Sequence, residues 1–338
     1  MSGIVTIERW TRGSLAAVAV AVALMALLTL GSLALDANAI DKLTTLFVYV
    51  ILGAMWNALD GYGGLVLVGQ QAFFGLGAYV TVRLADASMS VYPALLLAAI
   101  VVAGVSVPIS VFMLRLKAGE FAIGMWVVAE LAHLLVNLDT LVQGETGTWL
   151  IALNAYTAQT RHTLTYWSAL AAMAMLLAGL FVLLRSRAGV AIQAIRDDEE
   201  AAASLGVRVL AIKRIIFVLA AFGAALARAL WLATSITFQP KTYFSVQWTA
   251  DMVLMVLVGG LGTFEGPILG AVAFFAIEAL FGAAGVLYLV GLGATALVFS
   301  LFLPRGVWGW LANRFGLRLL FVGYHVRLPA AAKIVSTQ

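Results

Sequence analysis

The chain consists mainly of long apolar stretches separated by short polar segments. A helix of about 20 apolar residues spans the hydrocarbon core of a bilayer, and an apolar run of that kind predicts a transmembrane helix. The sequence therefore predicts an all-α, polytopic transmembrane helical bundle of about ten spans. The stretches that carry few charged side chains are 15–35, 43–59, 65–84, 92–114, 121–138, 164–184, 212–236, 252–261, 267–281 and 283–303.

Composition excludes an ordinary soluble protein. Of the 338 residues, 63% are hydrophobic and 11% are charged, and the mean hydropathy is +1.04. Soluble domains carry about 25% charged residues. The apolar surplus predicts a single transmembrane domain over residues 1–338, without room for a second large soluble domain. The chain has no cysteine and only three scattered histidines, so we expect neither a disulfide nor a metal site.

The basic residues favour one orientation in the membrane. If the N-terminus is cytoplasmic, most arginines and lysines fall on the inner side, as the positive-inside rule expects. The net charge of +4 then reflects membrane orientation, and no nucleic-acid partner is expected. Both termini, including a basic tail at 304–338, are predicted to be cytoplasmic. The inner-side residues are Arg9, Arg12, Arg115, Lys117, Arg185, Arg187, Arg196, Arg208, Lys213, Arg214, Arg305, Arg314, Arg318, Arg327 and Lys333.

Five basic residues do not fall on the inner side, and the first apolar stretch could be read as a signal peptide. Lys42, Arg83, Arg161 and Lys241 fall outside or at the outer end of a span, and Arg228 lies inside the seventh stretch. The first stretch follows Arg9 and Arg12 like a signal peptide. It is longer than the apolar region of roughly 7–15 residues in such a peptide, so an uncleaved helix is favoured.

Two apolar segments, 61–78 and 258–270, are rich in glycine. Close packing of helices in lipid explains part of this content, but Pro267 interrupts a continuous helix. With ten spans, spans two to five and seven to ten form two inverted four-helix halves. The first glycine segment then lies in span three and the second across spans eight and nine. Broken helices at corresponding positions of inverted halves indicate a translocation path.

Charged and amide side chains at membrane depth are candidates for lining this path. Ionisable groups in a span are costly and are usually functional or paired. Arg228 could therefore instead pair with Glu278 or Asp251, and the amides could instead join helices by hydrogen bonds. The path candidates are Asn57, Gln70, Gln71, Glu130, Arg228 and Glu278.

The most informative polar stretch is the loop 185–208. Asp197 is predicted to cap a short helix at 198–205, with Glu200 completing a capping-box-like pair. Gly206 stands where a left-handed residue ends a helix. The acidic run could be no more than a solvated loop face. A capped, short amphipathic helix in the longest basic-flanked inner loop instead suits docking in a groove of a partner protein.

This loop also carries a family resemblance. Glu200-Ala201-Ala202, followed after three residues by Gly206, resembles the EAA–Gly loop of ABC-importer permeases. Residues 194–202 and the two glycine segments look like branched-chain amino-acid ABC transporter permeases of the LivM type, over about residues 44–305. The resemblance implies a coupling helix held in a cleft of a cytoplasmic ATPase. Its residues would be Arg196, Asp197, Asp198, Glu199, Glu200, Ala201, Ala202 and Gly206.

The chain departs from the family pattern at two places. Residues 216–219 lack the proline of the longer importer motif, and Ala227-Arg228-Ala229 carries an arginine where family members commonly have a small residue. A cation inside a span is costly, so the arginine puts the usual substrate in doubt.

The resemblance implies a permease subunit of an ABC importer in the bacterial inner membrane. It would move branched-chain amino acids, or a similar small polar solute such as urea or an amide, by ATP-driven alternating access. Its partners would be cytoplasmic ATPase subunits, a second permease subunit, a periplasmic solute-binding protein and membrane lipid. The alternative is an ion-coupled secondary transporter that works without an ATPase, with Glu130 or Glu278 as a proton site.

Signatures of catalysis are missing from the sequence. It contains neither the phosphate-binding Gly-x-x-x-x-Gly-Lys-Ser/Thr motif of an ATPase nor a His-Glu-x-x-His or Gly-x-Ser-x-Gly hydrolase motif. No enzymatic activity, cofactor or metal is therefore expected of this chain.

Overall fold

A computed structural model describes residues 6–8, 12–32, 35–303, 305–315 and 325–327. Most of the predicted basic tail at 304–338 lies outside these ranges. The helices are α1 (Arg12–Gly31), α2 (Ala37–Asn57), α3 (Gln71–Asp86), α4 (Val91–Met113), α5 (Ala118–Asn137), α6 (Ala158–Arg185), α7 (Arg187–Asp197), α8 (Glu199–Ser204), α9 (Val209–Ser235), α10 (Pro240–Tyr243), α11 (Gln247–Gly259), α12 (Gly266–Phe281), α13 (Val286–Phe302) and α14 (Gly306–Phe315).

Short elements complete the chain. A π-helical turn, η1 (Ala58–Tyr62), continues α2, and three 3₁₀ turns are η2 (Gly144–Thr146), η3 (Ile151–Ala155) and η4 (Gly282–Ala284). Strand β1 (Thr6–Glu8) pairs antiparallel with β4 (His325–Arg327), and β2 (Thr148–Trp149) pairs with β3 (Thr237–Phe238). The prediction of a nearly all-helical chain is confirmed.

The predicted number of spans is not confirmed. Among the described residues, 6 helical segments are long and apolar enough to cross a membrane, and Ala16–Gly31 and Gly266–Phe281 are shorter apolar helices. The third predicted span, 65–84, is wrong as a continuous helix, because residues 63–70 are not helical and α3 starts at Gln71. The eighth and ninth correspond to α11 and α12, which have 13 and 16 residues.

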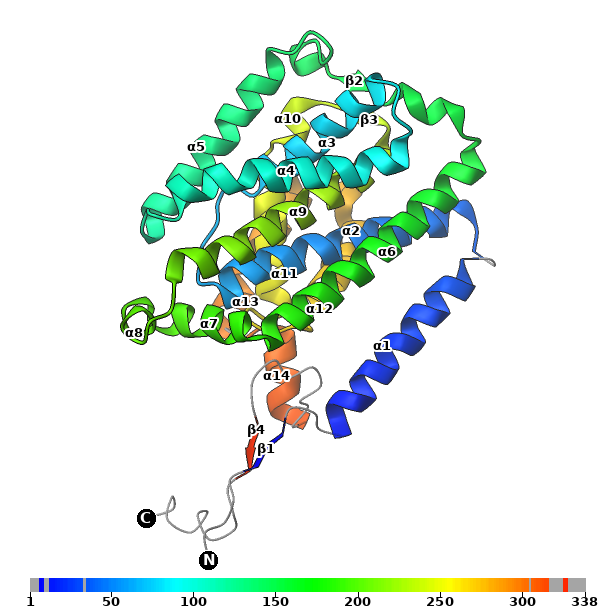
Figure 1. Ribbon diagram of the computed structural model, residues 1–338. Coiled ribbons are helices and arrows are strands. Elements are labelled where there is room, and N and C mark those ends of the chain that lie inside the picture. The colour runs from blue at the N-terminus through cyan, green and yellow to red at the C-terminus, as the bar shows by residue number, and fades with distance from the viewer. Residues whose placement is uncertain (1–5, 9–11, 33–34, 304, 316–324, 328–338) are drawn as a thin grey trace, which may run out of the picture.

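Helices α2 and α9 form the centre of the bundle (Figure 1). Every residue of α2 from Phe47 to Asn57 is buried. α9 packs against α3 and α4, whereas α2 packs against α6, α11 and α12. α1 runs along the edge of the bundle in Figure 1 and is tied to it by Tyr166, whose hydroxyl donates to the carbonyl of Leu28 at 2.8 Å.

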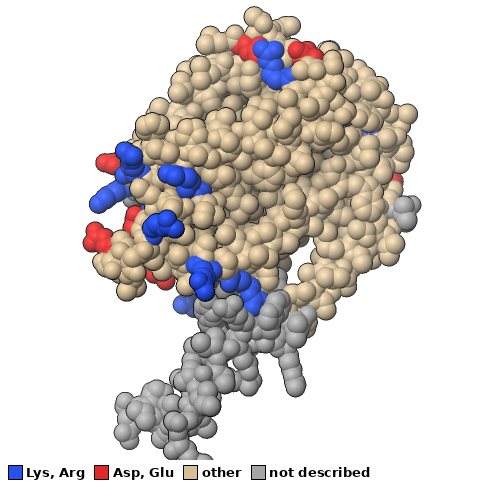
Figure 2. All heavy atoms as spheres, viewed as in Figure 1, with Lys and Arg blue, Asp and Glu red and all other residues tan. Residues whose placement is uncertain are grey.

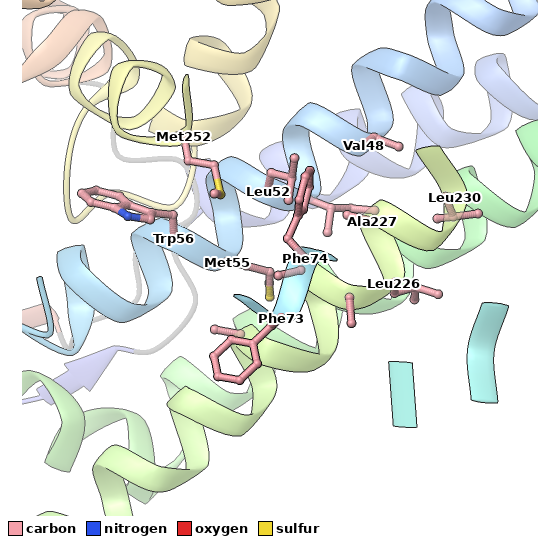
Figure 3. Close-up of a cluster of buried hydrophobic side chains, with 14 of the residues drawn as sticks. Val48, Leu52, Met55, Trp56, Phe73, Phe74, Leu226, Ala227, Leu230 and Met252 are labelled. Atoms are coloured by element: carbon pink, nitrogen blue, oxygen red, sulfur yellow. The ribbon is translucent and has the colours of Figure 1, made fainter. Parts of the chain in front are cut away.

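Small residues allow the central helices to approach closely. α9 contributes a nearly continuous alanine and glycine surface between Ala220 and Ala229. Large side chains of neighbouring helices fill the remaining space; Figure 3 shows Phe74 of α3 between Leu52 of α2 and Ala227 of α9. In lipid, where apolar burial gives little driving force, such close van der Waals packing holds helices together.

The surface matches a membrane protein. On the face shown in Figure 2, charged side chains gather at two ends, and a broad zone without charge separates them. Large apolar side chains such as Ile123, Val127 and Leu131 of α5 are exposed. An apolar band of this kind is stable next to lipid tails and unstable in water.

Candidate functional site

The predicted coupling loop folds as two short helices, α7 and α8. The side chain of Asp198 accepts a hydrogen bond from the backbone of Ala201 at 2.9 Å, so Asp198 caps α8. The prediction that Asp197 is the cap was wrong by one residue. Asp197 still ends α7, because the chain leaves the helical conformation only at Asp198, with φ −158° and ψ 107°.

The C-terminal end of α8 has the predicted glycine geometry. Gly206 has φ +85°, which is favourable for glycine and strained for other residues. Its N–H donates to the carbonyl of Ala203 at 2.9 Å, and the N–H of Val207 donates to that of Ala202 at 3.1 Å. This pair of bonds is the Schellman motif. The loop is therefore a defined structural element, with a capping interaction at each end of α8.

Arg196 connects the loop to the membrane helices. One terminal guanidinium nitrogen, Nη1, donates to the carbonyl of Gly61 at 2.7 Å, and Nε and Nη2 donate to Asp197 at 3.1 and 2.9 Å. Gly64 lies against the same side chain, because a Cβ on Gly64 would stand 3.2 Å from Cγ of Arg196. Arg196 thus bonds the loop directly to the π turn that ends α2.

Asn57 joins the two glycine segments. Its amide nitrogen donates to the carbonyl of Thr263 at 2.9 Å, and its amide oxygen accepts from the N–H of Gly262 at 2.8 Å. Gly61 is packed between Asn57 and the backbone of Gly262, which leaves no room for a side chain. Both groups of the Asn57 amide are used within the fold, as expected of an amide that joins two helices.

Within the first glycine segment, residues 63–70 return into the bundle as non-helical chain. Gly64 and Gly69 have φ of +63° and +156°, and a Cβ on Gly69 would collide with the backbone of Met125 in α5. Trp56 donates from its indole nitrogen to the carbonyl of Leu67 at 3.2 Å. The segment is therefore held by α2 and α5, and α3 starts inside the bundle.

Arg228 is the most unusual side chain at membrane depth. It is fully buried, and none of its three guanidinium nitrogens has a hydrogen-bond partner in the part of the chain that the structure describes. Four aromatic rings surround it instead. Its Cζ lies 3.7 Å from the ring centroid of Tyr243, 4.3 Å from Phe74 and from Trp248, and 5.4 Å from Trp231. We call these four rings the aromatic cage.

The two carboxylates that the sequence offers as partners of Arg228 bind other groups. Tyr49 donates from its hydroxyl to Glu278 at 2.8 Å, and Gln247 donates to Asp251 at 2.8 Å. No ion pair joins Arg228 to either carboxylate among the described residues. Of the two alternatives for Arg228, the structural ion pair is therefore not formed in this conformation.

The other path candidates separate into two groups. Gln71 accepts a hydrogen bond from Thr249 at 2.5 Å, and the buried amide of Gln70 has no partner within the described chain. Glu130 is exposed on α5 and lies 3.3 Å from a ring nitrogen of His133. The structure therefore brings Gln70 and Gln71 into the buried interior and leaves Glu130 outside it.

A polar cluster at the far end of the bundle holds α10 in place. Glu145 accepts from the amide of Asn137 at 2.6 Å and from the backbone N–H of Lys241 at 2.9 Å, and it contacts His133 at 2.8 Å. Partial desolvation raises the pKa of Glu145, but these hydrogen bonds and the charge of His133 outweigh it, so the pKa lies below its ordinary value. The ring of His133 also stacks on Phe244, which follows α10.

Sequence reasoning missed the aromatic cage and Tyr49. A signal was present, because Trp231, Tyr243 and Trp248 all follow the lone arginine within twenty residues. Aromatic faces stabilise a cation, so this local density next to Arg228 predicts a cation–π site. Phe74 and Tyr49 come from other helices and carry no such signal.

Comparisons with known proteins agree with the resemblance seen in the sequence. Residues 38–307 match the family described as branched-chain amino acid transport system, permease component. The high-affinity branched-chain amino acid transport system permease protein LivM of Salmonella typhimurium is 26% identical over 300 residues, which cover 80% of this chain and 70% of that protein. Its counterpart in Escherichia coli is 25% identical over 316 residues, covering 85% and 73%.

A solved structure also resembles the chain. It is an inward-facing conformation of a metal-chelate type ABC transporter, at 15% identity and a TM-score of 0.46, and the match covers 81% of this chain and 84% of that one.

Proposed function

Since this chain belongs to the family of branched-chain amino acid transport system permease components, we propose that it is the permease subunit of an ABC importer. The solute would be a branched-chain amino acid or a similar small polar molecule. The subunit moves it across the bacterial inner membrane by alternating access, driven by ATP hydrolysis in a separate subunit. Two relatives carry this transport function in their names, and the permease itself performs no covalent chemistry.

The observation that carries the proposal is the coupling loop. It offers a capped helix whose apolar Leu205 is 85% exposed beside the acidic Glu199 and Glu200. An exposed leucine at the end of a short, rigid helix suits insertion in an apolar cleft of a partner protein. Arg196 joins the same loop to Gly61 at the end of α2. The loop therefore has both a docking side chain and a direct connection to the spans.

Alternating access is supported by the helix contacts. In one half, α3 contacts α4 and α5; in the other, α11 contacts α12 and α13. The first helix of each half packs against the other half, since α2 contacts α11 and α12 while α9 contacts α3 and α4. This reciprocal pattern is the one expected of two inverted halves that rock against each other around a central path. Gln70, Arg228 and Glu278 are the path-lining candidates within it.

The proposed topology places both termini and the coupling loop in the cytoplasm. β1 and β4 pair, so the two ends of the described chain lie together. The start of α14 lies against Gly260, because a Cβ on Gly306 would collide with the backbone there. Gly262, in the turn after Gly260, donates from its N–H to Asn57, which packs against Gly61. The start of α14 is therefore near the end of α2 that Arg196 contacts. The partners are cytoplasmic ATPase subunits, a second permease and a periplasmic solute-binding protein.

The energy source tests this proposal. We expect proteoliposomes that contain this chain with its second permease and ATPase subunits to accumulate leucine only when ATP and the solute-binding protein are supplied. A proton gradient without ATP should drive no uptake, because the carboxylates Glu130 and Glu278 serve no proton transport. Uptake by this chain alone, driven by a proton gradient, would instead identify an ion-coupled secondary transporter.

A further inference from the structure

Arg228 has the features of a ligand-binding side chain. Its guanidinium is fully buried, and all three nitrogens lack a hydrogen-bond partner among the described residues. The ring centroids of the aromatic cage lie between 3.7 and 5.4 Å from Cζ of Arg228. Ring faces attract a cation electrostatically, but they do not provide the oxygen acceptors that five N–H groups require.

The chemistry of the guanidinium selects the missing partner. A buried donor that is left unsatisfied costs free energy, and a cation inside a membrane span is usually paired. The planar N–H fork of arginine matches the two oxygens of a carboxylate, with two parallel hydrogen bonds. Neutral urea or an amide offers a single carbonyl oxygen and no charge. A carboxylate is therefore the group that fits Arg228 best.

The rings of the cage match the aliphatic part of an amino acid. Trp231 belongs to the cage and stacks on Tyr49, with ring centroids 5.8 Å apart, and the Tyr49 hydroxyl donates to Glu278 at 2.8 Å. Glu278 is thus linked to the cage through Tyr49. Phe74, Trp248 and Trp231 offer an apolar surface suitable for a branched aliphatic side chain.

We propose that Arg228 and the aromatic cage form a binding site for the carboxylate of an amino acid in transit through the bundle. The inference rests on the proposed transport function and deepens it, because the site selects a carboxylate-bearing solute over urea or an amide. In this structure the four rings surround the guanidinium. When the bundle opens, the carboxylate takes up the free N–H groups.

The position of the site is compatible with transport. Arg228 lies seven residues before Ser235, the last residue of α9, which corresponds to about 10 Å of helix. The nearest ring, that of Tyr243, belongs to the four-residue helix α10. The Tyr243 hydroxyl is bonded to Ser235 and to the carbonyl of Thr237. We therefore expect a solute to reach Arg228 from the end of the bundle opposite the coupling loop only when α10 moves away from Arg228.

The test measures ligand binding by the complete permease–ATPase complex in lipid nanodiscs without the solute-binding protein. We expect wild-type complex to bind radiolabelled leucine, 4-methylpentanoate to compete, and leucinamide and urea not to compete. Arg228→Met should weaken leucine binding by about tenfold or more, because charge-assisted hydrogen bonds to the carboxylate are lost. Methionine removes a buried charge without adding a polar group, so the fold should tolerate it.

Arg214→Met is the matched control. Arg214 belongs to the same helix, and its Nε donates to the hydroxyl of Ser110 at 3.0 Å, outside the cage. The Arg214→Met complex should bind leucine as tightly as the wild-type complex does. Equal leucine binding by Arg228→Met and wild type, effective competition by leucinamide, or no leucine binding by wild type would overturn the site. Wild-type complex that accumulates no solute with ATP and binding protein present would instead contradict the proposed function.

Discussion

Arg196→Met is expected to reduce ATP-driven solute uptake by about tenfold or more, while the complex continues to hydrolyse ATP. Arg196 is the direct hydrogen-bonded connection between α7 and the π turn after α2, through the 2.7 Å bond to the carbonyl of Gly61. A hydrogen bond from a charged donor contributes roughly 1.5–3 kcal/mol, and about 1.4 kcal/mol corresponds to a factor of ten. Without it, we expect movement of α7 to reach the π turn much less efficiently, although Lys213 of α9 still bonds Glu199 of α8 at 2.6 Å.

The measurement is the ratio of solute transported to ATP hydrolysed in proteoliposomes. Arg187→Met is the matched control, because Arg187 is an exposed arginine at the start of the same helix and should leave the ratio unchanged. If Arg196→Met transports as many solute molecules per ATP as wild type, the connection through Gly61 does not couple the two events.

Gly270→Val is expected to prevent stable packing of α11 against α12. A Cβ on Gly270 would collide with the carbonyl oxygen of Met255 in α11. The positions of both atoms are fixed by the backbones of α12 and α11, which cannot move aside locally. Overpacking in a well-packed interior typically costs about 1–3 kcal/mol, and a collision with backbone should lie at or above the upper end. We expect a large loss of monodisperse protein and a lower thermal unfolding midpoint in detergent.

Gly291→Val in α13 provides the comparison for this variant. Nothing lies within 4 Å of a Cβ built on Gly291, so the same substitution should leave the yield and the unfolding midpoint near those of wild type. Equal stability of the two variants would show that α11 and α12 are not held at the distance that the structure gives.

Local signals in the coupling loop were readable because they depend on near neighbours. The stop at Gly206 follows from the conformation that glycine alone adopts without strain, and the start of α8 follows from an acidic side chain next to free N–H groups. The cap itself was predicted one residue too early. Asp197 and Asp198 are both competent caps by type, and the choice depends on where α7 ends, which is a tertiary effect.

The third span could not be read from hydropathy. Residues 65–84 are mostly apolar, but the chain at Gly64 and Gly69 takes positive φ values and lies against Arg196 and Met125. An apolar buried segment without helical structure has the same composition as a helix. The second glycine segment, 258–270, lies across the end of α11 and the start of α12, as expected from its place across spans eight and nine. Within it, the N–H of Gly262 donates to Asn57.

Pairing of charges inside the bundle was equally inaccessible to sequence. Arg228, Asp251 and Glu278 were equally plausible partners by type, whereas the fold directs Glu278 to Tyr49, Asp251 to Gln247 and Arg228 to the aromatic cage. Which of several polar groups meet depends on helix rotation and depth, and neither follows from the spacing along a single chain.

A photoreactive cross-linker attached to Leu205→Cys, in membranes that contain the complete complex, tests whether the coupling loop docks on the ATPase. The natural chain has no cysteine, so the variant has one attachment point on this chain, at a position that is 85% exposed. Gln159→Cys, exposed at the start of α6 at the other end of the bundle, is the control. We expect Leu205→Cys alone to cross-link to the ATPase subunit. Failure to reach the ATPase, together with labelling of Leu205→Cys by a membrane-impermeant thiol reagent from the periplasmic side, would contradict the account.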